Sequence, residues 1–248
     1  MPLVQEPTDS LALENIRGVL ARLEETILFG LIERAQFCRN EIIYRPGGLG
    51  PQLGGESLMA YLLHECERAH AKVRRYTSPD EHPFFHDLPA PALPPAAYKN
   101  PLRSNAININ DRIQRAYEEE IIPFLCAPGD DGQWGSSAVN DVSLLQALSK
   151  RIHYGKFVAE SKYRENPSRF DPMIRARDAA GLLASVTDVA VEAAVLDRVA
   201  RKTETFAKEL HALPGSRTAS PEQARAIYER WIIPLNKDVQ VLYLLGRG

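Results

Sequence analysis

Apolar residues recur at intervals of three and four along most of this chain of 248 residues. The first run begins near Ser10, and its apolar positions are Leu13, Ile16, Leu20, Leu23, Ile27 and Leu31. This spacing places them in one stripe of a helix that faces a protein core. The same period predicts further helices over residues 57–76, 108–126, 140–165, 168–184, 188–210 and 220–245. The sequence shows no convincing strand-like alternation, so the pattern predicts an all-α fold.

The longest breaks between these helices carry turn-forming residues. A glycine-rich stretch covers residues 46–55, and a proline-rich stretch runs from Ser78 to about Asn105. We expect the second stretch to be an ordered loop rather than a linker, because Phe84 and Phe85 offer apolar surface for packing onto the body of the protein.

Two helix features can be assigned to particular residues. Pro123 and Pro234 should bend or end their helices, because proline lacks the N–H donor and clashes with the preceding turn. The run Ser220-Pro221-Glu222-Gln223 combines a capping serine, a proline at the first helical position and a glutamine that completes a capping box. No internal repeat is evident, so we predict a single-domain helical bundle over residues 1–248.

The segment from Arg151 to Lys162 combines cations with apolar residues. Eleven residues are almost three helical turns, so the two cationic side chains project from one face, with Cα atoms about 16 Å apart. Ile152, Phe157 and Val158 supply apolar surface, which indicates a partly buried helix. Cations on a helix that must also pack favour a pocket for a small dianion over a solvated face.

Composition narrows the classes of partner. Thirty basic and 32 acidic residues give a net charge of −2, which leaves no broad basic field for nucleic acid or a membrane surface. No apolar run approaches the ~20 residues that span a bilayer. Residues 1–10 lack the basic and apolar regions of a signal peptide, so we predict a cytoplasmic protein. Cys38, Cys66 and Cys126 are widely spaced, and neither they nor the histidines show a metal-ligand pattern. We therefore expect reduced thiols, no metal and no other cofactor.

Further polar residues lie on helix faces, and each has two interpretations. Asp188 and Glu192 share a face at the start of a helix, where they either bind a ligand or complement the helix dipole. Asn236 and Gln240 share a face among apolar neighbours, and they either line a pocket or are exposed. Arg17 lies close to an apolar stripe, either as a pocket cation or as a rim charge whose stem covers apolar surface.

Together these side chains suit one kind of ligand. Four helices could bring three cations, an acidic pair and two amides to one cavity, and this set fits a small dicarboxylate that also bears a hydroxyl and an ether oxygen. The sequence offers no evident nucleophile–base pair, since His153 has no plausible partner nearby. The glycines of residues 47–55 do not follow a strand, which argues against phosphate binding. Any chemistry must therefore come from positioning and fixed charge.

Several segments resemble the fungal and plant branch of the all-α chorismate mutases, the yeast-type enzymes in particular. The resemblance extends over nearly the whole chain. The segments are Glu14-Asn15-Ile16-Arg17, Val73-Arg74-Arg75-Tyr76, Ser78-Pro79-Asp80-Glu81, Pro83-Phe84-Phe85, Trp134-Gly135-Ser136, Arg151 to Lys162, Ala190-Val191-Glu192 and Ile233-Pro234 to Leu245.

The resemblance implies a cofactor-independent [3,3]-sigmatropic rearrangement of chorismate to prephenate, which commits material to phenylalanine and tyrosine. It implies that Arg17 and Arg151 hold the substrate carboxylates and that Lys162 reaches a carboxylate and the ether oxygen. Glu192, with Asp188 beside it, would bind the ring hydroxyl. Asn236 would help to line the pocket.

Gln240 departs from the yeast-type pattern, which has a glutamate that must be protonated to donate a hydrogen bond to the ether oxygen. An amide donates at any ordinary pH. We therefore expect activity to persist through neutral and alkaline pH, and a Gln240→Glu variant to shift its activity toward acid. Asp188 and Asn236 also depart, because the pattern has asparagine and threonine at these positions.

The resemblance further implies a homodimer with an effector site between subunits, inhibited by tyrosine and activated by tryptophan. Arg74 and Arg75 match the arginines of that site, and Gly135 and Ser136 match its glycine-serine turn. Elements around residues 57–140 would carry regulation and dimerisation, next to a catalytic four-helix core. The two arginines have a second interpretation, since adjacent arginines at a helix end complement its dipole.

Three other residues bear on regulation. Val139 replaces a hydroxyl residue of the regulated pattern and Gln133 replaces an asparagine, so the sign of any effector response stays open. Ser220 keeps the hydroxyl at the start of the helix that is associated with the regulatory switch.

Two alternatives to a chorismate mutase stay open from the sequence. One is another enzyme that acts on chorismate or isochorismate in the same fold, for example by eliminating pyruvate. The other is a catalytically inactive helical dimer used for binding or regulation. The set of cations argues against the inactive dimer, because unpaired buried charges are costly unless a ligand offsets them.

Overall fold

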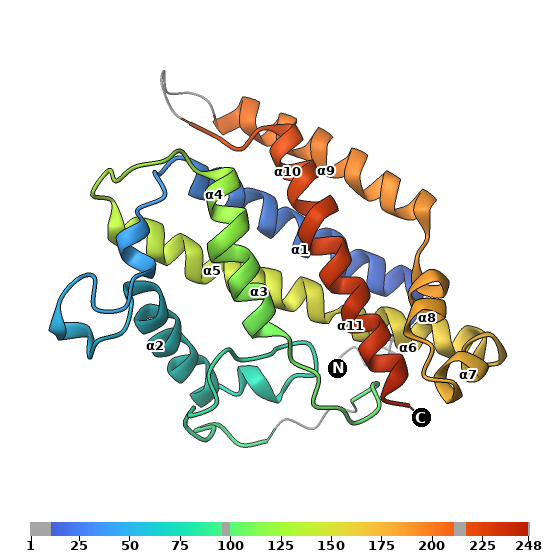
Figure 1. The fold of residues 1–248 in the computed structure, drawn as a ribbon. Helices are drawn as coiled ribbons and strands as arrows, with labels where there is room; N and C mark the ends of the chain where they lie inside the picture. Colours follow the sequence, from blue (N-terminus) through green and yellow to red (C-terminus); the bar gives the residue numbers. More distant parts are fainter. Residues whose placement is uncertain (1–10, 96–99, 211–216, 248) are drawn as a thin grey trace, which may run out of the picture.

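The computed structural model describes residues 11–95, 100–210 and 217–247, and within these ranges it contains helices, turns and loops but no strand (Figure 1). The prediction of an all-α fold is confirmed. The segment 1–10, on which the absence of a signal peptide was argued, lies outside the described residues. The α-helices are α1 (Leu13–Ala35), α2 (Leu58–Lys72), α3 (Asn110–Ala116), α4 (Ile122–Leu125), α5 (Trp134–His153), α6 (Gly155–Glu165), α7 (Pro167–Arg175), α8 (Ala179–Val186), α9 (Val189–Leu210), α10 (Pro221–Ile227) and α11 (Ile233–Leu245). Short 3-10 turns η1 (Glu41–Tyr44), η2 (Pro51–Leu53) and η3 (Arg75–Thr77) lie in the connections.

Side-chain caps fix where several helices begin. The Ser57 hydroxyl accepts the N–H of Ala60 at the start of α2. The predicted capping box is present at α10, where the Ser220 hydroxyl accepts the N–H of Gln223 and the Gln223 side chain accepts the N–H of Ser220. Such contacts satisfy N–H groups that the first helical turn leaves without a partner.

The helix predicted over residues 140–165 differs in two ways. It begins earlier, at Trp134, so that Gly135 and Ser136 lie in the first turn of α5. It is also divided at Tyr154 into α5 and α6. Gly155 opens α6 at a position where an added Cβ would lie 2.6 Å from the backbone oxygen of Asn236, so glycine permits the close approach of α11.

Two wider helical turns precede the prolines at which bends were predicted. Residues Tyr117–Ile121 and Tyr228–Ile232 form π-helical segments, η4 and η5, which lead into α4 and α11. Both carry the pattern Tyr-Glu-x-x-Ile-Ile-Pro, with prolines at 123 and 234. The sequence analysis noted no internal repeat, but this seven-residue motif occurs twice in the chain. A proline follows each π turn by two residues. Because proline has no N–H donor, one backbone hydrogen bond of a regular α-helix could not form at this place.

Helices α1 and α5 pack along each other at the centre of the bundle. Helix α9 lies against α1, and α11 lies against α5, α6 and α8 (Figure 1). The larger apolar core includes Leu31, Leu145 and Val239, and a second core around Phe157 and Leu182 lies at the α6–α8 end. This arrangement brings one polar face from each of α1, α5, α6, α9 and α11 toward the same place.

The described part of the proline-rich loop is held by buried polar groups, in agreement with an ordered loop. The Glu67 carboxylate accepts the backbone N–H groups of Phe84 and Phe85 at 2.9–3.1 Å. Lys156, which is 3% exposed, donates to the carbonyl of Ile107 at 2.7 Å. The loop is therefore anchored to α2 and to α6.

Among the described helices, none is by itself long and apolar enough to cross a membrane. The pair formed by α8 and α9 passes that test on length and composition only, and it is bent by 57°.

Candidate active site

A cavity of about 510 Å³ lies where α1, α5, α6, α9 and α11 meet. All seven residues that the sequence assigned to catalysis or substrate binding line it: Arg17, Arg151, Lys162, Asp188, Glu192, Asn236 and Gln240. A second cavity of about 580 Å³ adjoins the first and shares Arg17, Lys162 and Asp188 with it. The structure therefore brings the predicted cations, carboxylates and amides together around one cavity.

Arg151 is the most unusual charge in this cavity. It lies near the carboxyl end of α5 and is only 6% exposed, and its Nε is buried without a hydrogen-bond partner. Its guanidinium makes no hydrogen bond or ion pair with any described residue, and burial lowers its pKa although Tyr228 and Glu24 oppose that shift. An arginine buried in this way is costly unless an anion compensates it. The geometry thus indicates a site for an anionic group next to Arg151.

Lys162 supplies a second cation from α6. Its Nζ donates to the carbonyl oxygen of Val186 at 2.5 Å, at the carboxyl end of α8. Burial lowers its pKa, while Asp188 and Glu192 raise it. An ammonium group has three N–H donors, so two are left for a ligand. The break at Tyr154 does not separate Lys162 from Arg151, because both line the cavity.

Arg17 lies on α1 at the junction of the two cavities and is exposed. Both interpretations of this residue therefore apply in part, since its side chain is at the rim and also lines the cavity.

The two carboxylates at the start of α9 have different surroundings. Asp188 is exposed and caps the helix, because its Oδ1 accepts the N–H of Val191 at 3.1 Å. Glu192 is half-buried and paired with Lys237 of α11, whose Nζ lies 3.0 Å from Oε1 and 3.1 Å from Oε2. The position of Asp188 at the start of α9 agrees with the helix-dipole interpretation, although Asp188 also lines the cavity, whereas Glu192 is held in place across the cavity.

The two amides of α11 are buried, so the exposed alternative is wrong for both. Asn236 is 8% exposed and Gln240 is 4% exposed. The amide nitrogen of Asn236 donates to the carbonyls of Arg151 and Ile152 at 3.2 and 3.0 Å, and its Oδ1 accepts from Gln240 Nε2 at 2.9 Å. Gln240 Oε1 is buried without a partner. The two amides form a chain from the end of α5 into the cavity.

Three charged residues near the cavity were not singled out from the sequence. Glu24, which is 1% exposed, accepts two hydrogen bonds from Arg198, from Nε at 2.8 Å and from Nη2 at 2.7 Å, and it lies 3.3 Å from Lys202. Arg198 and Lys237 line the cavity. One signal was available, because Glu24 follows Arg17 by seven residues, about two turns, and so lies on the same face of α1.

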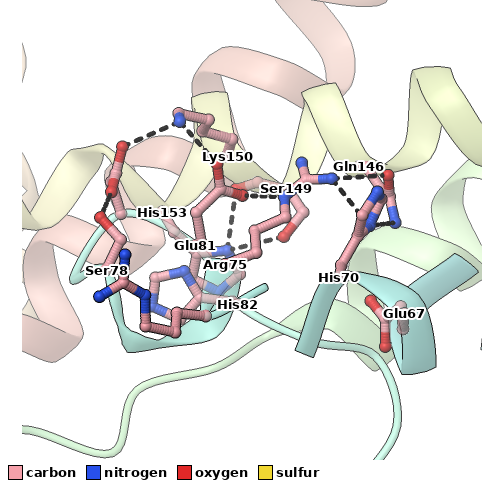
Figure 2. Close-up of polar contacts among 12 residues, drawn as sticks. Glu67, His70, Arg75, Ser78, Glu81, His82, Gln146, Ser149, Lys150 and His153 are labelled. Carbon is pink, nitrogen blue, oxygen red and sulfur yellow. Dashed lines mark hydrogen bonds and ion pairs between the residues drawn. The ribbon is translucent and has the colours of Figure 1, made fainter. Parts of the chain in front are cut away.

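The candidate effector arginines lie on the α2 side of α5. Arg75 contacts Glu81 at 3.0 Å, His70 at 3.0 Å and Gln146 of α5 at 3.0 Å, as Figure 2 shows. Arg74, whose φ is 69°, donates to the carbonyl of Pro94. Both line a cavity of about 320 Å³.

Gly135 and Ser136 are exposed in the first turn of α5 and do not meet these arginines within one chain. Gln146, the α5 partner of Arg75, follows Ser136 by ten residues, which is about 15 Å along a helix. Within one chain, the two groups of residues predicted for the effector site therefore lie apart.

Within the described ranges, no three His, Cys, Asp or Glu side chains form a group that could hold a metal ion. The cavity described above contains no residue arranged as a nucleophile beside a base. What it can supply is fixed positive charge, one oriented carboxylate and amide hydrogen-bond donors.

Comparison with known proteins shows the family of this chain. The profile of a family described as chorismate mutase type II matches residues 135–241. A chloroplastic chorismate mutase 1 of Petunia hybrida is 46% identical over 252 residues, which cover 98% of this chain and 78% of that protein. The chain belongs to the chorismate mutase family. A chorismate mutase of Schizosaccharomyces pombe is 44% identical, with 100% of this chain and 99% of that protein covered.

Solved chorismate mutase structures have the same fold. That of AtCM1 with tyrosine bound in an allosteric site is 44% identical, has a TM-score of 0.90 and covers 98% of both chains. That of a Candida albicans chorismate mutase in complex with L-Trp is 38% identical, with a TM-score of 0.90 and coverage of 98% of this chain and 94% of that one. As a member of this family, the protein is an isomerase.

Proposed function

We propose that this chorismate mutase converts chorismate to prephenate in the cavity between α1, α5, α6, α9 and α11. The observation that carries the assignment of this site is Arg151, whose buried guanidinium has no partner among the described residues. A planar guanidinium binds a carboxylate through two parallel hydrogen bonds. Arg17 at the rim would bind the second carboxylate of the substrate.

The remaining groups would act on the bond that breaks. Lys162 would donate to a carboxylate and to the ether oxygen, and Gln240 would donate to the same ether oxygen as negative charge develops there. Glu192 would accept a hydrogen bond from the ring hydroxyl, with Asp188 nearby. The rearrangement then needs no covalent intermediate, because the cavity selects the folded substrate conformer and stabilises the charge that forms.

The pH dependence follows from these assignments. An amide at residue 240 does not titrate, so activity should persist from neutral to alkaline pH. Lys162 sets the upper pH limit of activity in this scheme. Burial lowers its pKa, and deprotonation would remove the positive charge that binds the substrate.

The test is the product formed by the purified protein from chorismate. Prephenate supports the proposal, whereas pyruvate would assign the cavity to an elimination reaction on the same substrate. The absence of any product would support the inactive helical dimer.

The regulatory assignment is a further part of this proposal. Tyrosine and tryptophan would bind between two copies of the chain, with Arg74 and Arg75 from one copy and Gly135 and Ser136 from the other. Their separation of about 15 Å along α5 supports two copies, since an amino acid cannot bridge that distance within one chain. The segment 57–140 would carry these elements next to the catalytic core within one domain of residues 1–248.

Related structures with bound tyrosine and L-Trp support aromatic amino acids as effectors. Adding tyrosine or tryptophan should change the rate or the substrate saturation curve, and sedimentation should detect a dimer. A response to neither amino acid would refute the assignment of the four residues. The cytoplasm stays a prediction, because relatives include chloroplastic proteins.

A further inference from the structure

Asn236 lines the cavity, but the protein itself uses both ends of its amide. Its two N–H donors bind the carbonyls of Arg151 and Ile152 at the carboxyl end of α5. These acceptors fix which end of the amide is nitrogen, so Oδ1 must face the other way. Gly155 allows this contact, because a Cβ there would lie 3.0 Å from Nδ2 of Asn236.

The orientation of Asn236 determines that of Gln240. Asn236 Oδ1 accepts a hydrogen bond from Gln240 Nε2 at 2.9 Å, which fixes the nitrogen of the Gln240 amide on that side. An amide nitrogen carries two hydrogens, so one N–H of Gln240 stays free for a ligand while the other is used. The buried Oε1 of Gln240 has no partner.

We propose that Asn236 is a positioning residue that occupies one donor of residue 240, so that in this chain residue 240 must be an amide and not a carboxylic acid. This inference rests on the proposed function, in which Gln240 donates to the ether oxygen. A protonated carboxyl group has a single O–H. Beside Asn236 Oδ1 that O–H is drawn to the asparagine, and the ether oxygen receives no donor.

A threonine at residue 236 changes this situation, because a hydroxyl both donates and accepts. It can donate to the second oxygen of a carboxylic acid at residue 240 and leave the acid O–H for the ether oxygen. It can also accept from the amide of Gln240, so the single Asn236→Thr variant keeps an oriented donor. The two positions are therefore coupled.

Protonation of a glutamate at residue 240 depends on the charges around it. Seven charged residues line the same cavity. The cations are Arg17 of α1, Arg151 of α5, Lys162 of α6, Arg198 of α9 and Lys237 of α11, and the carboxylates are Glu192 of α9 and Asp188, which directly precedes α9. Five cations against two carboxylates favour the ionised form, while burial favours the neutral one. The comparison is therefore made from pH 4.5 to pH 8, so that the protonated form is sampled.

The experiment is a four-protein cycle: the natural chain, Asn236→Thr, Gln240→Glu and the double variant, each assayed for prephenate formation over this pH range. Loss of a donor to a developing oxyanion costs about 10²- to 10³-fold in kcat. The resemblance alone predicts that Gln240→Glu recovers its activity in acid. Because Asn236 Oδ1 takes the single O–H of the protonated acid, we expect instead that this variant falls about 100-fold at pH 8 and remains low at pH 4.5. Asn236→Thr should stay within about 10-fold of the natural chain, because an oriented donor remains.

The double variant decides the question. It should recover at least 10-fold over Gln240→Glu at pH 4.5, with activity that falls as pH rises. Equal activity of Gln240→Glu and the double variant at pH 4.5 would overturn the inference. Asn236→Ser repeats the cycle with a smaller hydroxyl residue in case threonine impairs folding, which urea unfolding measures for every variant.

Failure of the proposed function is distinguishable from failure of this inference. A natural chain that forms no prephenate removes both. A natural chain that forms prephenate, combined with additive effects of the two substitutions, removes only the coupling between residues 236 and 240.

Discussion

Methionine has an unbranched stem similar to that of arginine but no charge, so an Arg151→Met variant separates two opposite effects of the buried guanidinium. The first effect concerns stability. Arg151 is 6% exposed and makes no hydrogen bond with a described residue, so folding removes it from water with little return. Replacing buried charge with apolar atoms of similar volume can stabilise a protein by about 1–4 kcal/mol.

The lower part of that range applies here. Electrostatic attraction to Glu24 offsets part of the burial cost, although Arg198 already makes two hydrogen bonds to that carboxylate. We therefore expect Arg151→Met to raise the free energy of unfolding by about 1–2 kcal/mol.

The second effect concerns activity. Two hydrogen bonds from a guanidinium to a substrate carboxylate contribute about 1.5–3 kcal/mol each, or about 3–6 kcal/mol together. Their loss should lower kcat/KM by about 10²- to 10⁴-fold.

Arg34→Met is a matched control for the first effect. Arg34 is also buried, but its guanidinium makes five hydrogen bonds, one of them to Asp141 at 2.7 Å. Removing Arg34 leaves the buried Asp141 without its cation, with only the hydroxyls of Tyr44 and Tyr117 donating to it, so this variant should lose about 3–5 kcal/mol. Urea unfolding of both variants and prephenate formation by the Arg151 variant give the comparison.

Two results would refute the reasoning. If Arg151→Met is destabilised as much as Arg34→Met, then Arg151 has a structural partner and is not kept for a ligand. If Arg151→Met keeps normal kcat/KM, then the buried guanidinium does not bind the substrate.

Two further predictions concern charge. Lys237→Met should lower kcat/KM by about 3- to 10-fold, because Glu192 loses the cation that holds its carboxylate in place, whereas Lys237→Arg should restore kcat/KM; unchanged kcat/KM in Lys237→Met would exclude this role. Burial lowers the pKa of His153 to about 3 in the folded protein. Between about pH 6.5 and pH 3, this histidine is therefore protonated in the unfolded chain but neutral in the folded protein. Stability from this group is therefore lost as pH falls, by about 2 kcal/mol between pH 6.5 and 5, and His153→Gln should reduce the fall measured by urea unfolding at these pH values.

Local sequence patterns were sufficient to predict the helices and much of the cavity. Spacing along one helix placed Arg151 and Lys162 on a common face, and this holds across the break at Tyr154 because the side chains are only three turns apart. The same logic paired Glu192 with Asp188 and Asn236 with Gln240, because residues four apart share a helix face whatever they contact.

Contacts between distant segments could not be predicted in this way. The choice of Lys237 as partner of Glu192 depends on how α11 crosses α9, and the orientation of Asn236 depends on where α5 ends. Arg75 was assigned from its sequence context, but its contact with Gln146 requires the packing of α2 and α5. Such information lies in the tertiary structure and not in any single helix.

The π segment Tyr228–Ile232 has a consequence for the length of the chain. A π turn contains one more residue than an α turn, so it advances everything downstream by one step of the helical wheel, about 100°. Asn236 and Gln240 follow that step. A shortening of the chain by a single residue there would turn the whole end of the protein to another side with its composition otherwise unchanged. The count of residues before Pro234, as much as their chemistry, directs the polar face of this helix toward the cavity.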